Sequence, residues 1–94
     1  MVGRKQIGRR PALSHIQERQ DLALEVARKL RTGKRRTERL GSRRLAAFRK
    51  AHGGDVYSMK ADLSRQVSGF LGAGVVVDDV VRRGKVVAFT VCRA

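Results

Sequence analysis

The side chains of this sequence that are best equipped for chemistry are basic, and the chemistry they offer is contact with phosphate. The 94 residues include 22 lysines and arginines against eight acidic residues, which gives a formal net charge of +14. Residues 1–50 hold 16 of the basic side chains and only four acidic ones. Mutual repulsion on this scale destabilises a compact fold unless a polyanion neutralises it. The charge therefore predicts nucleic acid as the partner, with a solvated basic surface and an anionic membrane as alternatives.

Residues that commonly catalyse reactions or bind metals are few and scattered. His15 and His52 are far apart in the sequence, and no cysteine pair accompanies them. Asp78 and Asp79 have no further carboxylates at the spacing of metal ligands, and the glycines do not form a phosphate-binding loop. We therefore expect no catalytic activity, no cofactor and no metal site.

The sequence predicts a cytoplasmic protein that does not bind in a membrane. No apolar run approaches the ~20 residues that span a bilayer, and no apolar signal-peptide core follows the basic residues at the start. Cys92 is the single cysteine, so it cannot form an internal disulfide, which fits a reducing compartment.

The apolar pattern that organises the chain lies between Ser58 and Leu71. Its apolar residues follow a helical spacing and fall on one face; they are Met59, Leu63, Val67, Phe70 and Leu71. We expect Ser58 to cap this helix, Gly72 to end it, and Lys60, Asp62, Arg65 and Gln66 to lie mainly on its other faces.

Two further helices are expected upstream. Ser14 and Gln17 fit a capping box, which predicts a helix from Ser14 to Gly33 with an apolar stripe of Ile16, Ala23, Val26, Ala27 and Leu30. Residues 42–52 predict a short second helix. Between them, residues 34–44 are arginine-rich and are expected to form a loop or a polar helical turn starting at Thr37. Residues 1–13 are expected to be a flexible basic arm, either in a DNA minor groove or as a solubilising tail, and residues 14–94 form the folded domain.

A hairpin with a tight turn at Arg83-Gly84 is predicted for the last part of the chain. The turn pairs Val81 with Val86, Val80 with Val87, Asp78 with Phe89 and Val76 with Val91. The expected core face is Val76, Val80, Val87, Phe89 and Val91; the other face keeps Val77, Val81 and Val86 and so needs a second cover. That cover is either the N-terminal helix or a second subunit. A bulge at Asp78-Asp79 would alter this register.

The order of helix, helix, turn, helix and hairpin resembles winged helix-turn-helix domains over residues 43–91. The segment from Leu63 to Val76 is similar to the recognition helix and first wing strand of prokaryotic regulators with this fold. The resemblance implies an α+β fold: a three-helix helix-turn-helix core followed by a C-terminal β-hairpin. It also implies that the third helix enters the major groove, with Lys60, Ser64, Arg65 and Ser68 toward the bases, and that Arg82, Arg83 and Lys85 contact the flanking backbone. The sequence departs from the family where a strand usually joins the first two helices, because that region is arginine-rich rather than apolar.

These observations predict a sequence-specific duplex DNA-binding protein that forms a homodimer, acting as a transcriptional repressor or as a plasmid or phage accessory factor. The alternatives are an RNA-binding or ribosome-associated protein and a phage-type inhibitor that acts by protein–protein contact. The expected nucleic-acid contacts are Arg4, Lys5, Arg9, Arg10, Lys34, Arg35, Arg36, Arg39, Arg43, Arg44, Lys60, Ser64, Arg65, Ser68, Arg82, Arg83 and Lys85. Either the third helix or the arginine-rich segment 34–44 reads the bases.

Overall fold

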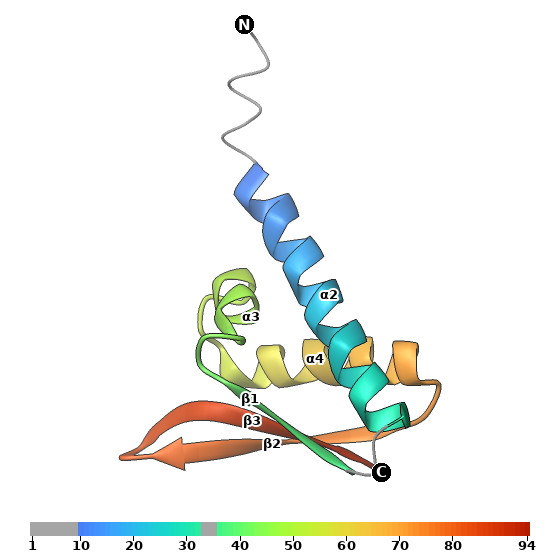
Figure 1. The fold of residues 1–94 in the computed structure, drawn as a ribbon. Helices are drawn as coiled ribbons and strands as arrows, with labels where there is room; N and C mark the ends of the chain where they lie inside the picture. The colour runs from blue at the N-terminus through green and yellow to red at the C-terminus, as the bar shows by residue number, and fades with distance from the viewer. Residues whose placement is uncertain (1–9, 33–35) are drawn as a thin grey trace, which may run out of the picture.

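The computed structural model describes residues 10–32 and 36–94, with side chains described from Ile16 onward. Within these residues the chain has an α+β fold of three helices and a three-stranded antiparallel sheet (Figure 1). The elements are α2 (Arg10–Thr32), β1 (Thr37–Gly41), α3 (Ala46–Ala51), α4 (Val56–Leu71), β2 (Val75–Arg82) and β3 (Lys85–Arg93). The expected fold class of helices followed by a C-terminal hairpin is therefore confirmed at this level.

Helix α2 begins earlier than the capping box predicts. It starts at Arg10, so Ser14 lies inside the helix and the expected cap at Ser14 is wrong. Pro11 suits this start, because an N–H in the first turn of a helix has no partner within the helix. The expected apolar stripe is buried at Ala23, Val26, Ala27 and Leu30, whereas the side chain of Ile16 is 41% exposed.

Strand β1 replaces the loop or helical turn that the arginine-rich sequence suggested. It pairs along its whole length with β3, from Thr37 opposite Cys92 to Gly41 opposite Ala88. Leu40 is its only fully buried side chain and lies opposite Phe89. Backbone pairing with a central strand supplies the stability that this polar segment lacks by itself, which is why propensity alone missed it.

The two helices after β1 form a tight pair. Helix α3 is shorter than the expected range of residues 42–52, and Leu45, just before it, is fully buried with Phe48. Asp55, not Ser58, caps α4: its carboxylate accepts the Tyr57 N–H at 3.2 Å and the Ser58 hydroxyl at 2.8 Å. The helix ends at Gly72 in the left-handed conformation, as predicted.

The hairpin has the predicted turn but not the predicted register. Val81 pairs with Val86, as expected, yet a bulge follows that leaves Val87 unpaired with β2. Every later pair is therefore shifted by one residue: Val80 pairs with Ala88, Asp78 with Thr90 and Val76 with Cys92. The bulge lies near Val80 and Val81 rather than at Asp78-Asp79.

The shift moves side chains between the two faces of the sheet. Val77 is buried against Val91 and Phe89, whereas Val76 is 48% exposed, so the expected positions of Val76 and Val77 are reversed. Phe89 and Val91 lie in the core as predicted, and Val86 packs against it. A substitution at Val77 would therefore test the core, not a subunit interface.

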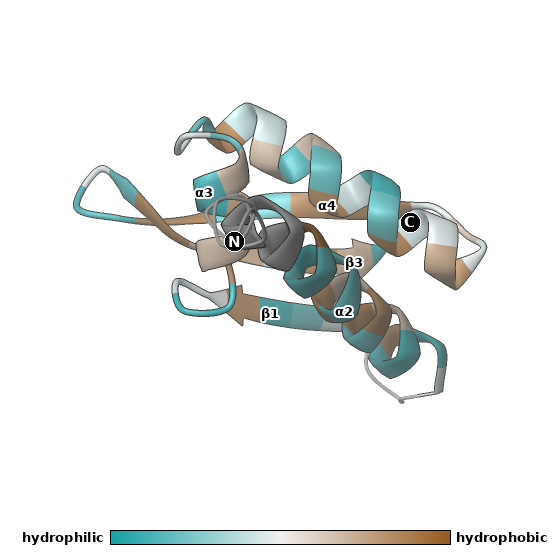
Figure 2. Cartoon of the chain, turned by 90° about the horizontal axis from the view of Figure 1, so that it is seen from above, coloured by the Kyte–Doolittle hydropathy of each residue, from teal (hydrophilic) through white to brown (hydrophobic). Residues whose placement is uncertain are grey.

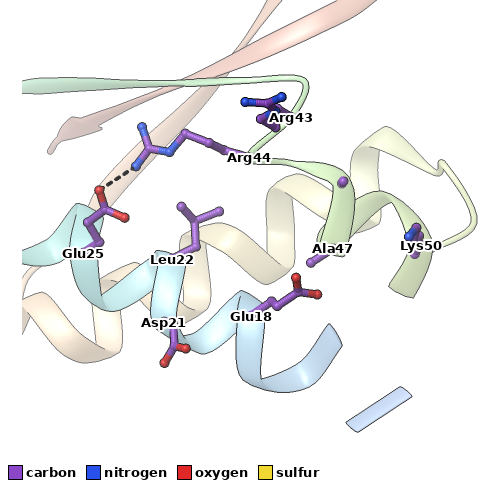
Figure 3. Close-up of a pocket in the computed structure, with 9 residues that line it drawn as sticks. Glu18, Asp21, Leu22, Glu25, Arg43, Arg44, Ala47 and Lys50 are labelled. Carbon is purple, nitrogen blue, oxygen red and sulfur yellow. Dashed lines mark ion pairs between the residues drawn. The ribbon is translucent and has the colours of Figure 1, made fainter. Parts of the chain in front are cut away.

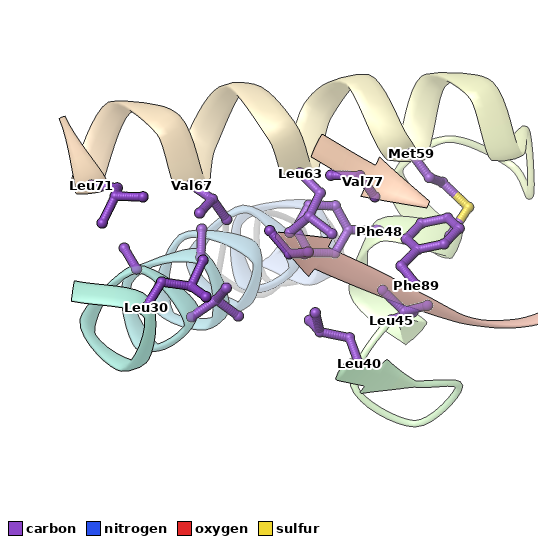
Figure 4. Close-up of a cluster of buried hydrophobic side chains, with 14 residues drawn as sticks. Leu30, Leu40, Leu45, Phe48, Met59, Leu63, Val67, Leu71, Val77 and Phe89 are labelled. Carbon is purple, nitrogen blue, oxygen red and sulfur yellow. The ribbon is translucent and has the colours of Figure 1, made fainter. Parts of the chain in front are cut away.

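Both long helices pack on the same face of the sheet, whose strand order is β1-β3-β2 (Figure 1). The core between them is aliphatic with two phenylalanines, Phe48 and Phe89, and includes Leu30, Leu40 and Leu63 (Figure 4). Because α2 shares the core face with α4, it does not cover the opposite face. No described helix lies over that opposite face, although Ala88, in the middle of it, is only 1% exposed.

Candidate nucleic-acid interface

The tip of the hairpin presents three exposed cations, Arg82, Arg83 and Lys85. Arg83 has a φ of 52° and Gly84 a φ of 77°, so both central residues of the turn are left-handed. This is the turn type that matches the twist of a two-stranded ribbon, but asparagine or glycine is the usual residue at the first position. An arginine there keeps a positive charge at the extreme end of the sheet at a conformational cost of about 1 kcal/mol.

The same end of the molecule carries the β1–α3 loop and α3, as two perpendicular views agree (Figures 1 and 2). These segments add three exposed cations, Arg43, Arg49 and Lys50. We call the six residues Arg43, Arg49, Lys50, Arg82, Arg83 and Lys85 the basic end. Among the described residues none of the six forms an ion pair, although Arg43 and Lys50 face acidic side chains of α2 across a cleft. The charges of Arg49, Arg82, Arg83 and Lys85 are therefore the ones most available to an external anion.

The arginine-rich segment expected at residues 34–44 does not form one patch. Arg36 lies at the opposite end of the sheet, where its carbonyl accepts the Arg93 N–H at 3.1 Å. Arg39 is exposed in the middle of β1, and Arg44 is held 3.2 Å from Glu25 and 3.6 Å from Glu38. Strand β1 separates Arg36 from Arg43 by about 15 Å or more at ~3.4 Å per residue. The segment is therefore not a continuous reading surface.

Five sequence-predicted contacts, Arg4, Lys5, Arg9, Lys34 and Arg35, lie outside the described residues. Arg10 is the first residue of α2, and its side chain is not described.

Helix α4 presents a stripe of small and polar side chains on its outer surface. Tyr57, Ala61, Ser64 and Ser68 follow a helical spacing, and Arg65 lies beside them with 76% of its side chain exposed. Tyr57 is 83% exposed, so its ring does not pack over the core. Of the expected base-facing residues, Ser64 and Ser68 thus lie on this stripe, and Arg65 lies on its α2 side, where it lines a shallow pocket with Arg19 and Phe70. Lys60 lines the same shallow pocket as Tyr57, Ala61 and Ser64, and its ammonium group lies 2.6 Å from the Asp79 carboxylate on β2.

Asp62 is the feature of this region that the sequence did not indicate. It was expected on an outer face of the helix, yet its side chain is only 2% exposed. One carboxylate oxygen lies 2.5 Å from Arg19 Nη1 and 2.8 Å from His52 Nε2. The other accepts hydrogen bonds from Gln66 at 2.8 Å and from Arg65 at 3.2 Å. The carboxylate therefore joins α2, the end of α3 and α4.

The environment of Asp62 favours its ionised form. Burial by itself raises the pKa of Asp62, but hydrogen bonds from Gln66, His52 and Arg19, together with the Arg19 charge, outweigh that effect. The pKa therefore lies below the ordinary value of 3.8. A helical-wheel signal for this burial exists, since Asp62 follows Met59 by three residues and borders the apolar stripe.

A cleft of about 400 Å³ lies between α2 and α3 but does not resemble a ligand site (Figure 3). Its α2 wall is acidic, with Glu18, Asp21 and Glu25, and the opposite wall is basic, with Arg43, Arg44 and Lys50. The Arg44–Glu25 ion pair crosses it. Opposite charges on facing walls compensate one another, so the cleft favours neither an anion nor a cation.

Within residues 10–32 and 36–94, no group of three or more histidine, cysteine or acidic residues is placed to hold a metal ion. In the same part of the chain, no helix combines the length and apolar character that crossing a membrane requires.

The strained turn gives a first prediction. Replacing Arg83 with asparagine is expected to raise the free energy of unfolding by about 0.5–1 kcal/mol, because asparagine tolerates the left-handed region. Chemical denaturation measures the change. Arg82→Asn is the matched control, since it removes the same charge from a neighbouring position in ordinary strand conformation. If the two variants have equal stability, the left-handed conformation of Arg83 costs nothing.

Comparison of the chain with protein-family models, with curated proteins and with solved structures found no match.

Proposed function

We propose that this chain is a winged-helix-type protein that binds duplex DNA, with α4 in the major groove and the hairpin tip on the flanking backbone. The observation that carries the proposal is the outer surface of α4. It exposes small and polar side chains at helical spacing, and no aliphatic side chain larger than alanine interrupts the stripe. Small side chains let a helix approach base edges closely, and hydroxyl and guanidinium groups are the donors that read them.

The arrangement of elements adds support. Strand β1 lies between the first two helices, at the place where winged-helix domains usually have a strand and where the arginine-rich sequence did not predict one. The basic end then supplies six cations near the start of α4 and at the hairpin tip (Figure 2). Phosphate contacts position a protein on the duplex, whereas base contacts give specificity. The proposed role as a repressor or accessory factor follows from sequence-specific binding of this kind.

Arg65 is the side chain on this surface best suited to read a base. Asp62 accepts one of its N–H groups at 3.2 Å, while most of the guanidinium group is exposed. A guanidinium group has five N–H donors, so the remaining donors can form a bidentate contact with guanine. The Asp62 contact reduces the rotamer freedom that Arg65 would lose on binding.

Arg65→Ala tests the proposal. A preferred duplex is first selected from a random pool with the wild-type chain, and each variant is then titrated against that duplex and a scrambled one at fixed salt. We expect Arg65→Ala to weaken specific binding about 5- to 100-fold, the equivalent of a lost bidentate contact, and to leave non-specific binding nearly unchanged. Arg28→Ala on α2 is the control for loss of one exposed charge. Equal loss on both duplexes, or no loss, would reject α4 as the reading helix.

The exposure of Tyr57 favours one second candidate, binding to single-stranded RNA or DNA. An aromatic ring that is 83% exposed can stack on an unpaired base, a contact worth about 1–3 kcal/mol. Under this alternative, Tyr57→Ala weakens binding to a single strand strongly, whereas Tyr57→Phe retains it. Under the duplex proposal, we expect neither Tyr57 variant to lose affinity for single strands selectively.

A further inference from the structure

On the face of the sheet opposite the helices, the pairing of the strands arranges the side chains in regular rows. Three rows of side chains cross it, each from β1 through β3 to β2. The rows are Thr37–Cys92–Val76, Arg39–Thr90–Asp78 and Gly41–Ala88–Val80. Residues paired across antiparallel strands point to the same face, and the burial of Leu40, Val77, Phe89 and Val91 assigns the alternate residues to the core.

We infer that this face binds a second copy of the chain, related by a two-fold axis that runs along β3. Such an axis places β1 of one protomer over β2 of its partner and leaves each β3 over the other β3. Each row then faces the same row of the partner, with its β1 residue over the partner's β2 residue. The interface contacts follow from the register and do not depend on whether the chain binds nucleic acid.

Charge complementarity selects this arrangement. In the middle row, Arg39 and Asp78 lie at opposite ends, and both are exposed. The reversed order brings Arg39 of each protomer over Asp78 of its partner, which gives two equivalent ion pairs. Neither residue has an ion-pair partner among the described residues of its own chain. A two-fold axis in the plane of the interface and perpendicular to the strands instead places β1 over β1 and β2 over β2, so Arg39 does not lie over the partner's Asp78.

The remaining rows fit the same axis by size. Gly41 faces the partner's Val80 position, so the smallest residue of the face lies over a branched one. Along the axis itself, β3 carries Ala88, Thr90 and Cys92. Ala88 is only 1% exposed, so Thr90 and Cys92 supply the contacts there, and both are small enough for two sheets to approach closely. Val76, at 48% exposure the more exposed of the two valines, gains cover from the partner's Thr37.

The axis has one consequence that rests on the proposed function. Rotation about a line parallel to the strands preserves direction along them, so both hairpin tips point the same way. The two basic ends therefore lie together at one end of the dimer, and twelve cations face the same side. A single nucleic acid molecule that spans both ends binds with two linked contacts and stabilises the dimer by mass action.

The face is small, which sets the expected affinity. Three rows of three residues bury less than the ~800 Å² per partner of a standard interface. We therefore expect a weak dimer, with a dissociation constant of roughly 10 μM or above, as is typical of interfaces of this size.

Charge reversal in a mixture of two variants tests the geometry. Arg39→Glu alone places acidic residues at both ends of the middle row, and Asp78→Lys alone places basic residues there. Each homodimer then has two repulsive contacts, whereas a mixed dimer has two attractive ones. Sedimentation equilibrium of the full chain, from ten to several hundred micromolar, measures association of the wild type, of each variant and of the equimolar mixture. The measurement is made without nucleic acid at about 0.15 M salt, which screens the long-range repulsion between two chains of net charge +14. Circular dichroism verifies that both variants fold.

We expect the wild type to dimerise, each variant alone to associate at least about tenfold more weakly, and the mixture to regain most of the wild-type affinity. If one variant does not fold, Arg39→Gln and Asp78→Asn replace the pair, and each is expected to weaken dimerisation alone. A wild-type chain that stays monomeric throughout this range would overturn the interface. Variants that dimerise like the wild type would exclude this face, and a mixture without recovery would exclude the axis along β3. Because no nucleic acid is present, these outcomes do not depend on the proposed function.

Discussion

Asp62→Ala is expected to lower the free energy of unfolding by about 3 kcal/mol. Removing one partner of a buried charged network costs about 3–5 kcal/mol, because the opposite charges remain without compensation. The lower end applies here, since the Arg19, His52 and Arg65 side chains retain 16%, 26% and 76% exposure and can turn to water. No other described carboxylate contacts three helical segments, so no second group replaces it.

The matched control is Asp79→Ala. Asp79 also forms an ion pair, with Lys60 at 2.6 Å, but both side chains are about one-third exposed. Ion pairs at such surfaces contribute about 0–1 kcal/mol. Chemical denaturation of both variants, under identical conditions, compares the two carboxylates directly. Equal losses would show that burial of Asp62 adds nothing, and the network would then be a surface feature in solution.

The pH dependence of stability gives an independent test of the same network. The pKa of Asp62 is lower in the folded chain than its ordinary value of 3.8. The unfolded chain therefore binds the proton more readily, so this stabilisation is fully present above pH ~4 and is lost as the pH falls through the folded-state pKa. Asp62→Ala is expected to flatten the loss of stability below pH 4 relative to wild type. If Asp62→Ala loses stability below pH 4 as steeply as the wild type does, the stabilising role of the Asp62 carboxylate is contradicted.

Features encoded by neighbouring residues were predictable from the sequence. The apolar face of α4, its end at Gly72 and the turn at Arg83-Gly84 each depend on local spacing or local backbone freedom. The position of Arg65 off the apolar face followed from the same helical period. In each case the tertiary contacts agree with the local conformational preference of the residues.

Features that depend on distant pairing were not predictable. Strand β1 has one buried apolar residue, Leu40. It forms a strand because its backbone pairs with β3, some fifty residues away. The bulge at Val87 inverts the faces of Val76 and Val77, since a shift of one residue moves every following side chain to the other side. Asp62 is buried only because Arg19 and His52, which lie on other elements, form hydrogen bonds with its carboxylate.

The second large effect expected is the dependence of nucleic-acid affinity on salt. The basic end supplies six cations, of which Arg43 and Lys50 also face acidic side chains of α2. If the chain contacts six to ten phosphates in all, its affinity for duplex DNA is expected to fall about 10³- to 10⁵-fold between 50 and 200 mM salt. Fluorescence anisotropy of a labelled duplex, titrated at several salt concentrations, measures the slope. Binding that barely changes over this range would reject the polyanion and favour a protein partner.

Two double variants with equal charge then locate the contacts. Arg82→Gln with Lys85→Gln removes two charges at the hairpin tip and is expected to reduce the salt slope by about two. Arg28→Gln with Arg36→Gln removes two exposed charges from the opposite end of the sheet and is expected to leave the slope nearly unchanged. The reverse result would place the phosphates at the end of α2 and the start of β1. Equal losses from both variants would mean that the phosphates extend along the whole of α4, because this helix begins beside α3 and ends beside the end of α2.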